Sequence, residues 1–201
     1  GGRAVPTAPC RPRSAIVMGI RDDIAEVLLT EEQIRARVKE LGAQISRDYQ
    51  GRDLLILFIL KGALIFVADL IREIDMHVQL DFMVVSSYGA RTRTSGSVRI
   101  VTDMRSDVRG RHVLIVEDII DSGLTLHEII QHLKVREPAS LEICTLLSKP
   151  ARRQVLLDVR YVGFEIPDAF VVGYCLDFNE RYRNLPFVGV LKPECYDGLV
   201  E

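Results

Sequence analysis

The sequence lacks both a long hydrophobic run and an excess of either charge. Its longest uninterrupted apolar run spans only 54–60 and is too short to cross a bilayer. The 26 lysines and arginines are balanced by 28 acidic residues, which gives a net charge of −2. This balance argues against a dominant basic surface, although it is compatible with a local basic patch. We therefore expect neither a membrane nor nucleic acid among the partners.

Cysteine is scarce, and its four positions form no CxxC pair. Cys144 and Cys175 lie in apolar runs typical of strands, where a free cysteine usually packs as a small hydrophobic residue. Reduced cysteines without a metal or disulfide pattern are the rule inside cells. A cytoplasmic location is therefore expected.

Common nucleotide-binding and nucleophile motifs are also absent. Neither GxGxxG nor GxxxxGK[ST] occurs, which excludes the usual dinucleotide and P-loop sites. Ser122 has no GxSxG surroundings, which argues against a serine nucleophile. His127 and His132 are separated by about 140° around a helix and cannot share one zinc ion comfortably.

What is present is an alternation of apolar runs and helical patterns. A capping box of Thr30 and Gln33 opens a predicted helix over 31–49. Further helices are predicted at 63–74 and from 124 onwards, and strands at 54–60, 80–85, 113–116, 141–147, 169–174 and 188–191, the last closing the sheet. This order predicts an α/β fold with a central, mostly parallel sheet and helices on both faces.

The domain organisation is simple. A chain of 201 residues is long enough for one sizeable core, so we predict a single domain over 24–201. Residues 1–23 contain three prolines and no sustained period, which is typical of a flexible tail. The small, polar segment 86–97 predicts either a functional loop or a plain solvated hairpin.

The segment 113–133 carries the clearest chemical signal. It reads as a strand, an acidic turn, a small-residue loop and a helix, an arrangement in which the helix N-terminus binds phosphate. Glu117, Asp118 and Asp121 are unusual beside an anion, but carboxylates accept hydrogen bonds from sugar hydroxyls or bind a metal. Two interpretations stay open: a phosphorylated sugar with Mg²⁺, or an acidic turn in which Asp121 or Ser122 caps the helix.

A family resemblance favours the first interpretation. VEDIIDSGLT at 116–125 resembles the phosphoribosyl pyrophosphate motif of type I phosphoribosyltransferases, and from about Val27 to Tyr196 the chain is similar to the bacterial hypoxanthine-guanine phosphoribosyltransferases. Further motifs occur in the family's order: Leu60-Lys61-Gly62, Ser87-Tyr88, Lys149, Phe170-Val171, Asp177 and Arg183. The resemblance implies a small hood region, a mobile lid over 86–97, and a cis peptide in the 60–62 loop.

The same resemblance implies an activity and its partners. Phosphoribosyl pyrophosphate would donate its 5-phosphoribosyl group to N9 of hypoxanthine or guanine with Mg²⁺ as cofactor, giving IMP or GMP and pyrophosphate. This is a purine salvage reaction, and the family usually forms homodimers or homotetramers. Lys149 would donate to O6 of the base, which favours 6-oxopurines over adenine.

The resemblance also assigns individual roles. Asp121 matches the general acid/base that faces N7 of the purine. The phosphoribosyl group would be bound by Glu117, Asp118, Asp121, Ser122, Gly123, Leu124 and Thr125. Pyrophosphate would be bound by Lys61, Gly62 and Arg183, and the purine by Lys149, Phe170, Val171 and Asp177. Mg²⁺ would be held by Glu117, Asp118 and Asp177, with Ser87 and Tyr88 at the base of the lid.

Other interpretations remain for the whole chain and for single residues. A phosphoribosyltransferase-fold regulator that binds nucleic acid, or a plain phosphate-binding α/β module, would share the 116–125 motif. Phe170 could be a core residue, and Lys61 could extend from a loop into solvent.

Overall fold

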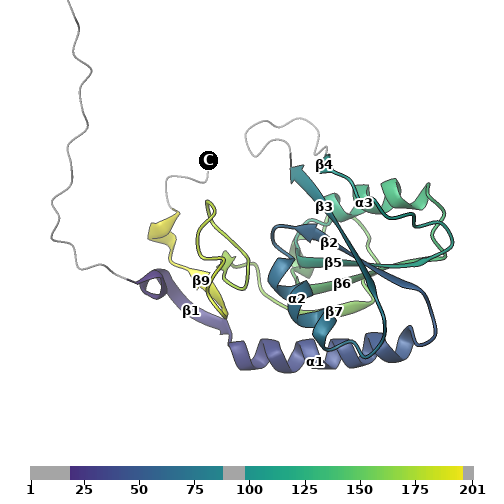
Figure 1. Ribbon diagram of the computed structural model, residues 1–201. Coiled ribbons are helices and arrows are strands. Elements are labelled where there is room, and N and C mark those ends of the chain that lie inside the picture. The colour runs from purple at the N-terminus through teal and green to yellow at the C-terminus, as the bar shows by residue number, and fades with distance from the viewer. Residues whose placement is uncertain (1–18, 88–97, 197–201) are drawn as a thin grey trace, which may run out of the picture.

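The apolar runs in the middle of the chain form a six-stranded sheet with the order β4-β3-β2-β5-β6-β7 (Figure 1). The computed structural model describes residues 19–87 and 98–196. The strands of this sheet are β2 (Leu54–Leu60), β3 (Gln79–Ser87), β4 (Val98–Thr102), β5 (His112–Ile120), β6 (Ser140–Ser148) and β7 (Tyr161–Glu165). Only β4 is antiparallel to its neighbour, so the prediction of a mostly parallel sheet is confirmed.

Both faces of the sheet are covered by helices, because the side chains of a strand alternate between its faces. In β5, Leu114 and Val116 pack in the cluster that includes α1 (Glu31–Asp48) and α2 (Leu64–Arg72). Val113 and Ile115 pack in the opposite cluster with α3 (Leu124–Lys134). The predicted helices on both faces are therefore confirmed.

A second, three-stranded antiparallel sheet forms the hood, which lies beside the main sheet in Figure 1. It consists of β1 (Ile24–Leu29), β9 (Val188–Leu191) and β8 (Val171–Val172), in that order. Its small core contains Val172, Tyr182, Leu185, Phe187 and Leu191. The prediction that 188–191 closes the main sheet is wrong, since β9 pairs with β1 and β8.

Two further strand predictions need correction. Of 169–174 only Val171 and Val172 form a strand, because the chain turns at Gly173 (φ +98°), where a Cβ would lie 2.0 Å from the Phe187 carbonyl oxygen. The strand beside β6 is instead β7, which the sequence analysis missed. In addition, β5 continues to Ile120, so Glu117 and Asp118 lie at the end of a strand and not in a turn.

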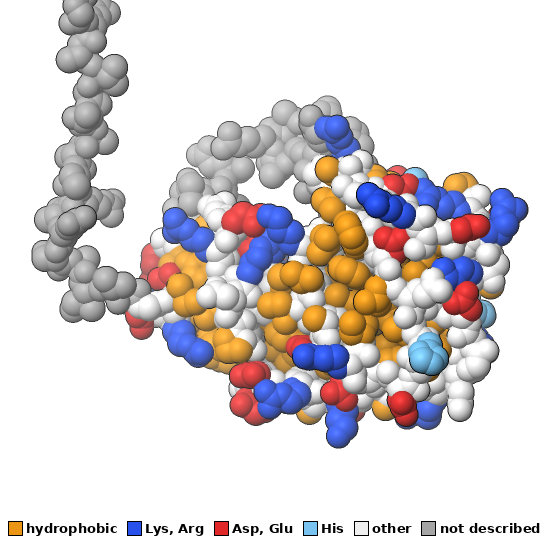
Figure 2. Space-filling model, viewed as in Figure 1, with side chains coloured by type: hydrophobic (Ala, Val, Ile, Leu, Met, Phe, Trp, Pro, Cys, Tyr) orange, Lys and Arg blue, Asp and Glu red, His pale blue; other side chains and the backbone are white. Residues whose placement is uncertain are grey.

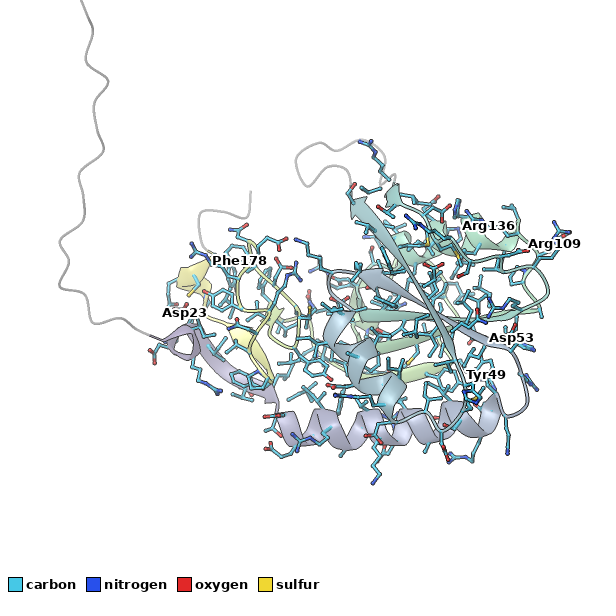
Figure 3. The ribbon with its side chains drawn as sticks, in the orientation of Figure 1. Asp23, Tyr49, Asp53, Arg109, Arg136 and Phe178 are labelled. Atoms are coloured by element: carbon cyan, nitrogen blue, oxygen red, sulfur yellow. The ribbon has the colours of Figure 1, made fainter. Side chains whose placement is uncertain are left out.

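The predicted tail and lid lie partly within the described residues. Ile20–Asp23, the end of the predicted tail, form a 3-10 helix, and the Tyr182 hydroxyl donates a hydrogen bond of 2.7 Å to Asp23, which is labelled in Figure 3. Ser86 and Ser87, the start of the predicted lid, are the last residues of β3. Tyr88 and the rest of the lid, to 97, lie outside the described residues, as do 1–18 and 197–201.

The topology directs attention to one edge of the main sheet. From β2 the chain passes to β3 on one side and later returns to β5 on the other, so the strand order reverses between β2 and β5. Open α/β sheets bind ligands in the crevice at the carboxyl ends of such a pair. The opposite edge carries Tyr49 and Asp53, both labelled in Figure 3 far from the hood.

Membrane and cysteine features can be stated for the described residues. Across 19–87 and 98–196, no helix is both long and apolar enough to cross a bilayer. Cys144, Cys175 and Cys195 are free thiols, and the first two are buried as predicted.

Helices α1 and α2 meet at a glycine. A Cβ on Gly42 would lie 2.6 Å from the Glu73 carbonyl oxygen at the end of α2. One turn along α1, the Ser46 hydroxyl donates to the Gly42 carbonyl (2.7 Å) and accepts from the Asp75 N–H (2.9 Å). The backbone of α2 is therefore fixed close to α1, with no room for a side chain.

We predict that Gly42→Ala lowers the free energy of unfolding by about 1–2 kcal/mol, because the clash with backbone outweighs the better helix propensity of alanine. Urea denaturation would measure the change. Gly19→Ala is the matched control, since its Cβ would have no neighbour closer than 3.8 Å, and it should stay within about 0.5 kcal/mol of the parent protein. An unchanged midpoint for Gly42→Ala would contradict the close approach of the two helices.

Candidate active site

A cavity of about 420 Å³ lies where the carboxyl ends of β2 and β5 meet. Its lining combines the 117–123 segment and the first turn of α3 with the end of β2, one residue of β3 and one residue of the hood. The residues are Ile59, Leu60, Gly62, Val85, Glu117, Asp118, Ile119, Ile120, Asp121, Ser122, Gly123, Thr125, Leu126 and Asp177. Eight predicted site residues therefore share one cavity: Gly62, Glu117, Asp118, Asp121, Ser122, Gly123, Thr125 and Asp177.

The loop after β5 leaves the N-terminus of α3 open. Gly123 is the N-cap residue with φ +83° and has no capping side chain, so the interpretation that Asp121 or Ser122 occupies the N-cap position is wrong. The Ser122 hydroxyl, one residue before the N-cap, accepts a long hydrogen bond (3.4 Å) from the Leu124 N–H. The Ser122 carbonyl also holds the loop, because it accepts from the Gln154 N–H (2.9 Å). The first N–H groups of a helix have no intrahelical partners and attract anions. This end of the cavity is therefore suited to a phosphate.

Two adjacent carboxylates lie at the other side of the loop. Glu117 and Asp118 are half-buried, and burial together with the adjacent Asp118 charge raises the pKa of Glu117 well above its ordinary value. Burial also raises the pKa of Asp118, although the Ile119 N–H, 2.7 Å from its carboxylate, opposes the shift. Such a pair favours a ligand that brings hydroxyl donors or a cation.

Gly62 packs directly on this acidic pair. A Cβ at this position would lie 1.9 Å from the Asp118 Oδ2 atom. Any side chain there would push the carboxylate away or move the loop after β2. Glycine is therefore required by the distance between the two loops.

The donor set fits a magnesium ion that is shared with a substrate. Among residues 19–87 and 98–196, no three carboxylate, histidine or cysteine side chains are grouped so as to hold a metal alone. Mg²⁺ commonly uses one or two carboxylates and completes its shell with phosphate oxygens and water. Glu117 and Asp118 would supply these one or two carboxylates, and Asp177 lines the same cavity.

Asp121 is linked to Lys149 through two residues that the sequence analysis did not select. Arg152 Nε lies 3.1 Å from Asp121 Oδ1, and Arg152 Nη1 lies 3.3 Å from Asp168. Lys149 Nζ, on a side chain that is 7% exposed, lies 3.7 Å from the same Asp168 oxygen. The backbone supports this side of the site too, since the Lys149 N–H donates to the Ile120 carbonyl (3.0 Å).

Phe170 lies on the surface of the hood, so the alternative that it is a core residue is wrong. Its side chain is 36% exposed, and its ring stacks on Tyr196 with centroids 4.9 Å apart. Phe178, labelled in Figure 3, meets the Phe170 ring edge-on, with ring centroids 5.5 Å apart. Val171 follows in β8, where it pairs with Val190. Phe170 and Val171 are thus presented by the hood and do not line the cavity.

The two cationic residues predicted for pyrophosphate approach each other from different parts of the chain. The Leu60–Lys61 peptide is cis, as the resemblance implied. Lys61 Nζ lies 3.0 Å from Glu180 Oε2, and Arg183 Nη2 lies 2.9 Å from Asp177 Oδ1. Cys175 joins both sides, because its thiol donates to the Lys61 carbonyl (3.2 Å) and its own carbonyl accepts from Arg183 (2.6 Å).

Arg152, Asp168 and Glu180 are the polar residues that sequence reasoning missed. Each lies within three residues of a selected position, which is the only signal that the sequence offers. Their contacts join segments that are separate in the sequence. Charged residues in loops are too common for proximity alone to select them.

Comparisons with known proteins agree with this geometry. Residues 25–179 match a family model described as the phosphoribosyl transferase domain. The hypoxanthine-guanine phosphoribosyltransferase of Bacillus subtilis (strain 168) is 52% identical over 179 residues, which cover 89% of this chain and 99% of that protein. The enzyme of the same name from Mycobacterium avium is 53% identical over 180 residues, 87% of this chain and 89% of that protein.

Solved structures give the same result. A crystal structure of a hypoxanthine phosphoribosyltransferase from Staphylococcus aureus superposes with a TM-score of 0.86 at 50% identity, and the match covers 90% of this chain and 99% of that chain. A crystal structure of a hypoxanthine-guanine phosphoribosyltransferase from Bacillus anthracis gives a TM-score of 0.79 at 46% identity, over 84% of this chain and 98% of that chain. The chain therefore belongs to the phosphoribosyltransferase family and, within it, to the hypoxanthine-guanine phosphoribosyltransferases.

Proposed function

We propose that this enzyme transfers the 5-phosphoribosyl group of phosphoribosyl pyrophosphate to N9 of hypoxanthine or guanine, giving IMP or GMP and pyrophosphate. The observation that carries the proposal is the cavity in which a helix N-terminus with glycine at the N-cap adjoins two half-buried carboxylates. A phosphate would bind at the helix N-terminus, and ribose hydroxyls would donate to the two carboxylates. A bare anion would need the helix N-terminus but not the carboxylates.

The phosphoribosyl group would be held by the 117–125 segment. Backbone N–H groups of the loop, Leu124 included, and the hydroxyls of Ser122 and Thr125 would bind the 5′-phosphate. Glu117 and Asp118 would accept hydrogen bonds from the ribose hydroxyls. Since both carboxylates are costly to bury without a partner, substrate binding would relieve an existing strain on this part of the chain.

The purine would bind between the end of β6 and the hood. Lys149 would donate to O6, and Phe170 would stack on the base with Val171 providing backbone contacts. Asp121 would exchange a proton with N7 as the glycosidic bond forms. Arg152, 3.1 Å from Asp121, would orient this carboxylate towards the base.

The departing pyrophosphate would be stabilised by Lys61, the backbone at Gly62, and Arg183. Bound Mg²⁺, held by Glu117, Asp118 or Asp177 together with substrate oxygens, would supply positive charge as the bond from C1′ to oxygen breaks. Positive charge at that point favours the transition state over the bound substrate, because the negative charge on the leaving group is still growing.

We predict that Asp121→Asn lowers kcat by about 100-fold or more with hypoxanthine and guanine, because an amide cannot exchange the N7 proton. A spectrophotometric assay with phosphoribosyl pyrophosphate and Mg²⁺ would test hypoxanthine, guanine, xanthine and adenine separately. Asp158→Asn, at an exposed aspartate outside the cavity, is the matched control and should retain activity.

Two results of this assay would contradict the proposal. If no base turned over while phosphoribosyl pyrophosphate still bound, the chain would be a ligand-binding regulator and not an enzyme. If adenine were used as well as hypoxanthine, the proposed donation from Lys149 to O6 would be wrong.

We predict that Glu117→Gln stabilises the ligand-free protein at pH 7 by about 0.5–2 kcal/mol while it abolishes most activity, because it removes a charge that burial disfavours. Because the pKa of Glu117 is raised in the folded state, the folded protein binds a proton on Glu117 more readily than the unfolded chain does. The stability gained by the substitution should therefore shrink as pH falls towards the ordinary glutamate pKa of about 4.3, where the wild-type side chain is also neutral in the folded protein.

Urea denaturation at several pH values would measure this gain. Glu128→Gln, at an exposed glutamate on α3, is the control and should change stability by less than about 0.5 kcal/mol. A loss of stability in Glu117→Gln would mean that Glu117 is a structural residue.

We further propose that the protein forms a homodimer or homotetramer. Leu80, Phe82 and Val101 are each 40–57% exposed on β3 and β4, and Figure 2 shows apolar side chains gathered on one face of the molecule. Leu80 and Phe82 are in register with Ile56 and Phe58 of β2, on the face that α1 and α2 cover further along the sheet. An uncovered continuation of a buried face is typical of an interface.

We predict that Phe82→Arg shifts the protein towards the monomer, because a guanidinium cannot be buried there without a partner. Sedimentation velocity over a range of concentrations would measure the shift. Leu156→Arg is the matched control, since Leu156 is 99% exposed and its substitution should leave the oligomer intact. If the oligomer persisted in Phe82→Arg, the interface would lie on another face of the protein.

A further inference from the structure

Glu180 bridges the two cations of the proposed pyrophosphate site. Its Oε2 atom lies 3.0 Å from Lys61 Nζ, and its Oε1 atom lies 3.4 Å from Arg183 Nη2. One carboxylate thus takes the position of an anionic ligand between two residues that are more than 100 positions apart in the sequence. The side chains of Lys61 and Glu180 are 64% and 63% exposed, so an anion from solvent can reach and separate them.

The backbone at Glu180 indicates that the glutamate is not there for the fold. Asn179 and Glu180 have φ of 51° and 61°, and the flanking Phe178 and Arg181 exchange backbone hydrogen bonds of 3.2 and 3.0 Å. A two-residue turn with both central φ positive prefers Asn-Gly, because glycine has no Cβ to clash. A non-glycine residue in this conformation costs free energy, and such an outlier points to a function of its side chain.

Asp177 keeps the turn in place. Its carboxylate accepts from the Glu180 N–H (2.8 Å) and lies 2.9 Å from Arg183 Nη2. Arg183 therefore has two carboxylates, whereas the ion pair of Lys61 is with Glu180. When an anion displaces Glu180, Asp177 stays on Arg183 and Lys61 changes its partner completely. The exchange is thus confined to one side chain on a short turn.

We propose that Glu180 is the internal counter-ion of the pyrophosphate site, which the pyrophosphate group must displace on binding and which returns to Lys61 and Arg183 as pyrophosphate leaves. The proposal rests on the proposed function, since that assigns Lys61 and Arg183 to pyrophosphate. Glu180 is a positioning residue: it acts through Lys61 and Arg183 and sets how tightly the site holds a polyanion. Without Glu180, Arg183 would keep only Asp177, and Lys61 would lose this carboxylate, so the site would bind its product more tightly and release it more slowly.

The test is calorimetric titration of the full-length chain with pyrophosphate in the presence of Mg²⁺, at low ionic strength. Glu180→Gln keeps the shape of the side chain and removes its charge, and we expect pyrophosphate to bind about three- to tenfold more tightly, the range that two exposed ion pairs can supply. Glu180→Gly should show the same gain and fold at least as well, since glycine suits the turn. The control Glu32→Gln, at an exposed glutamate on α1, should match the parent protein within about twofold, which corrects for the change in net charge.

Two further readouts separate a counter-ion from a structural residue. The gain in pyrophosphate affinity from Glu180→Gln should shrink at high salt, because salt screens exposed charges. It should also be smaller in a Lys61→Met background, because the ion pair between Lys61 and Glu180 is already absent there. In turnover, the KM for phosphoribosyl pyrophosphate should fall more than kcat changes. A Glu180→Gln protein that binds pyrophosphate no more tightly than the parent would overturn the proposal.

Failure of this proposal and failure of the proposed function give different results. If Lys61→Met weakens pyrophosphate binding but Glu180→Gln does not strengthen it, the site is correct and Glu180 is not its counter-ion. If Lys61→Met leaves pyrophosphate binding unchanged, Lys61 is not part of the site, and both statements are wrong.

Discussion

Burial of β5 on both of its faces is the constraint on which the rest of the structure depends. Leu114 and Val116 face α1 and α2, while Val113 and Ile115 face α3, and every one of these four side chains is at most 1% exposed. Glu117 and Asp118 interrupt this apolar pattern close to the carboxyl end of the strand, which finishes at Ile120. The loop that follows must then reverse into α3. The position of the acidic pair, the phosphate loop and the open helix N-terminus all follow from this one strand.

The site built on this strand is less stable than it could be. Two carboxylates side by side are half-buried, and burial raises the pKa of both. A capping side chain at the N-cap position would stabilise α3, yet Gly123 occupies this position, and the helix start has only one long side-chain hydrogen bond, from the Leu124 N–H to the Ser122 hydroxyl. Function and stability therefore make opposite demands at the same few residues, as is common at binding sites.

The hood shares a hydrophobic core with the main sheet and completes the site by ion pairs. Five of its buried residues form a small cluster of their own, whereas Leu29, Val171 and Val188, one from each of its strands, pack in the same cluster as α1 and α2. Lys61 and Glu180 join the two parts through exposed charges, and Cys175 adds one weak hydrogen bond to the Lys61 carbonyl. Such contacts are individually weak and exchange readily with a charged ligand. Exposed ion pairs between two firmly packed parts are suited to a site that must take up and release a polyanion.

The sequence by itself determined the elements whose signals are local. The capping box at Thr30, the continuous run Leu54–Leu60 and the 116–125 motif were each read from neighbouring residues, and the structure has the corresponding helix, strand and loop. Tertiary structure decided which strands pair, because β1, β8 and β9 carry no local mark that separates them from the main sheet. It also decided the contacts of Arg152, Asp168 and Glu180, since a charge in a loop acquires a role only from the charge that the fold brings beside it. Hydrophobic periodicity and turn chemistry depend on adjacent residues, whereas strand partners and ion pairs depend on residues far apart in the chain.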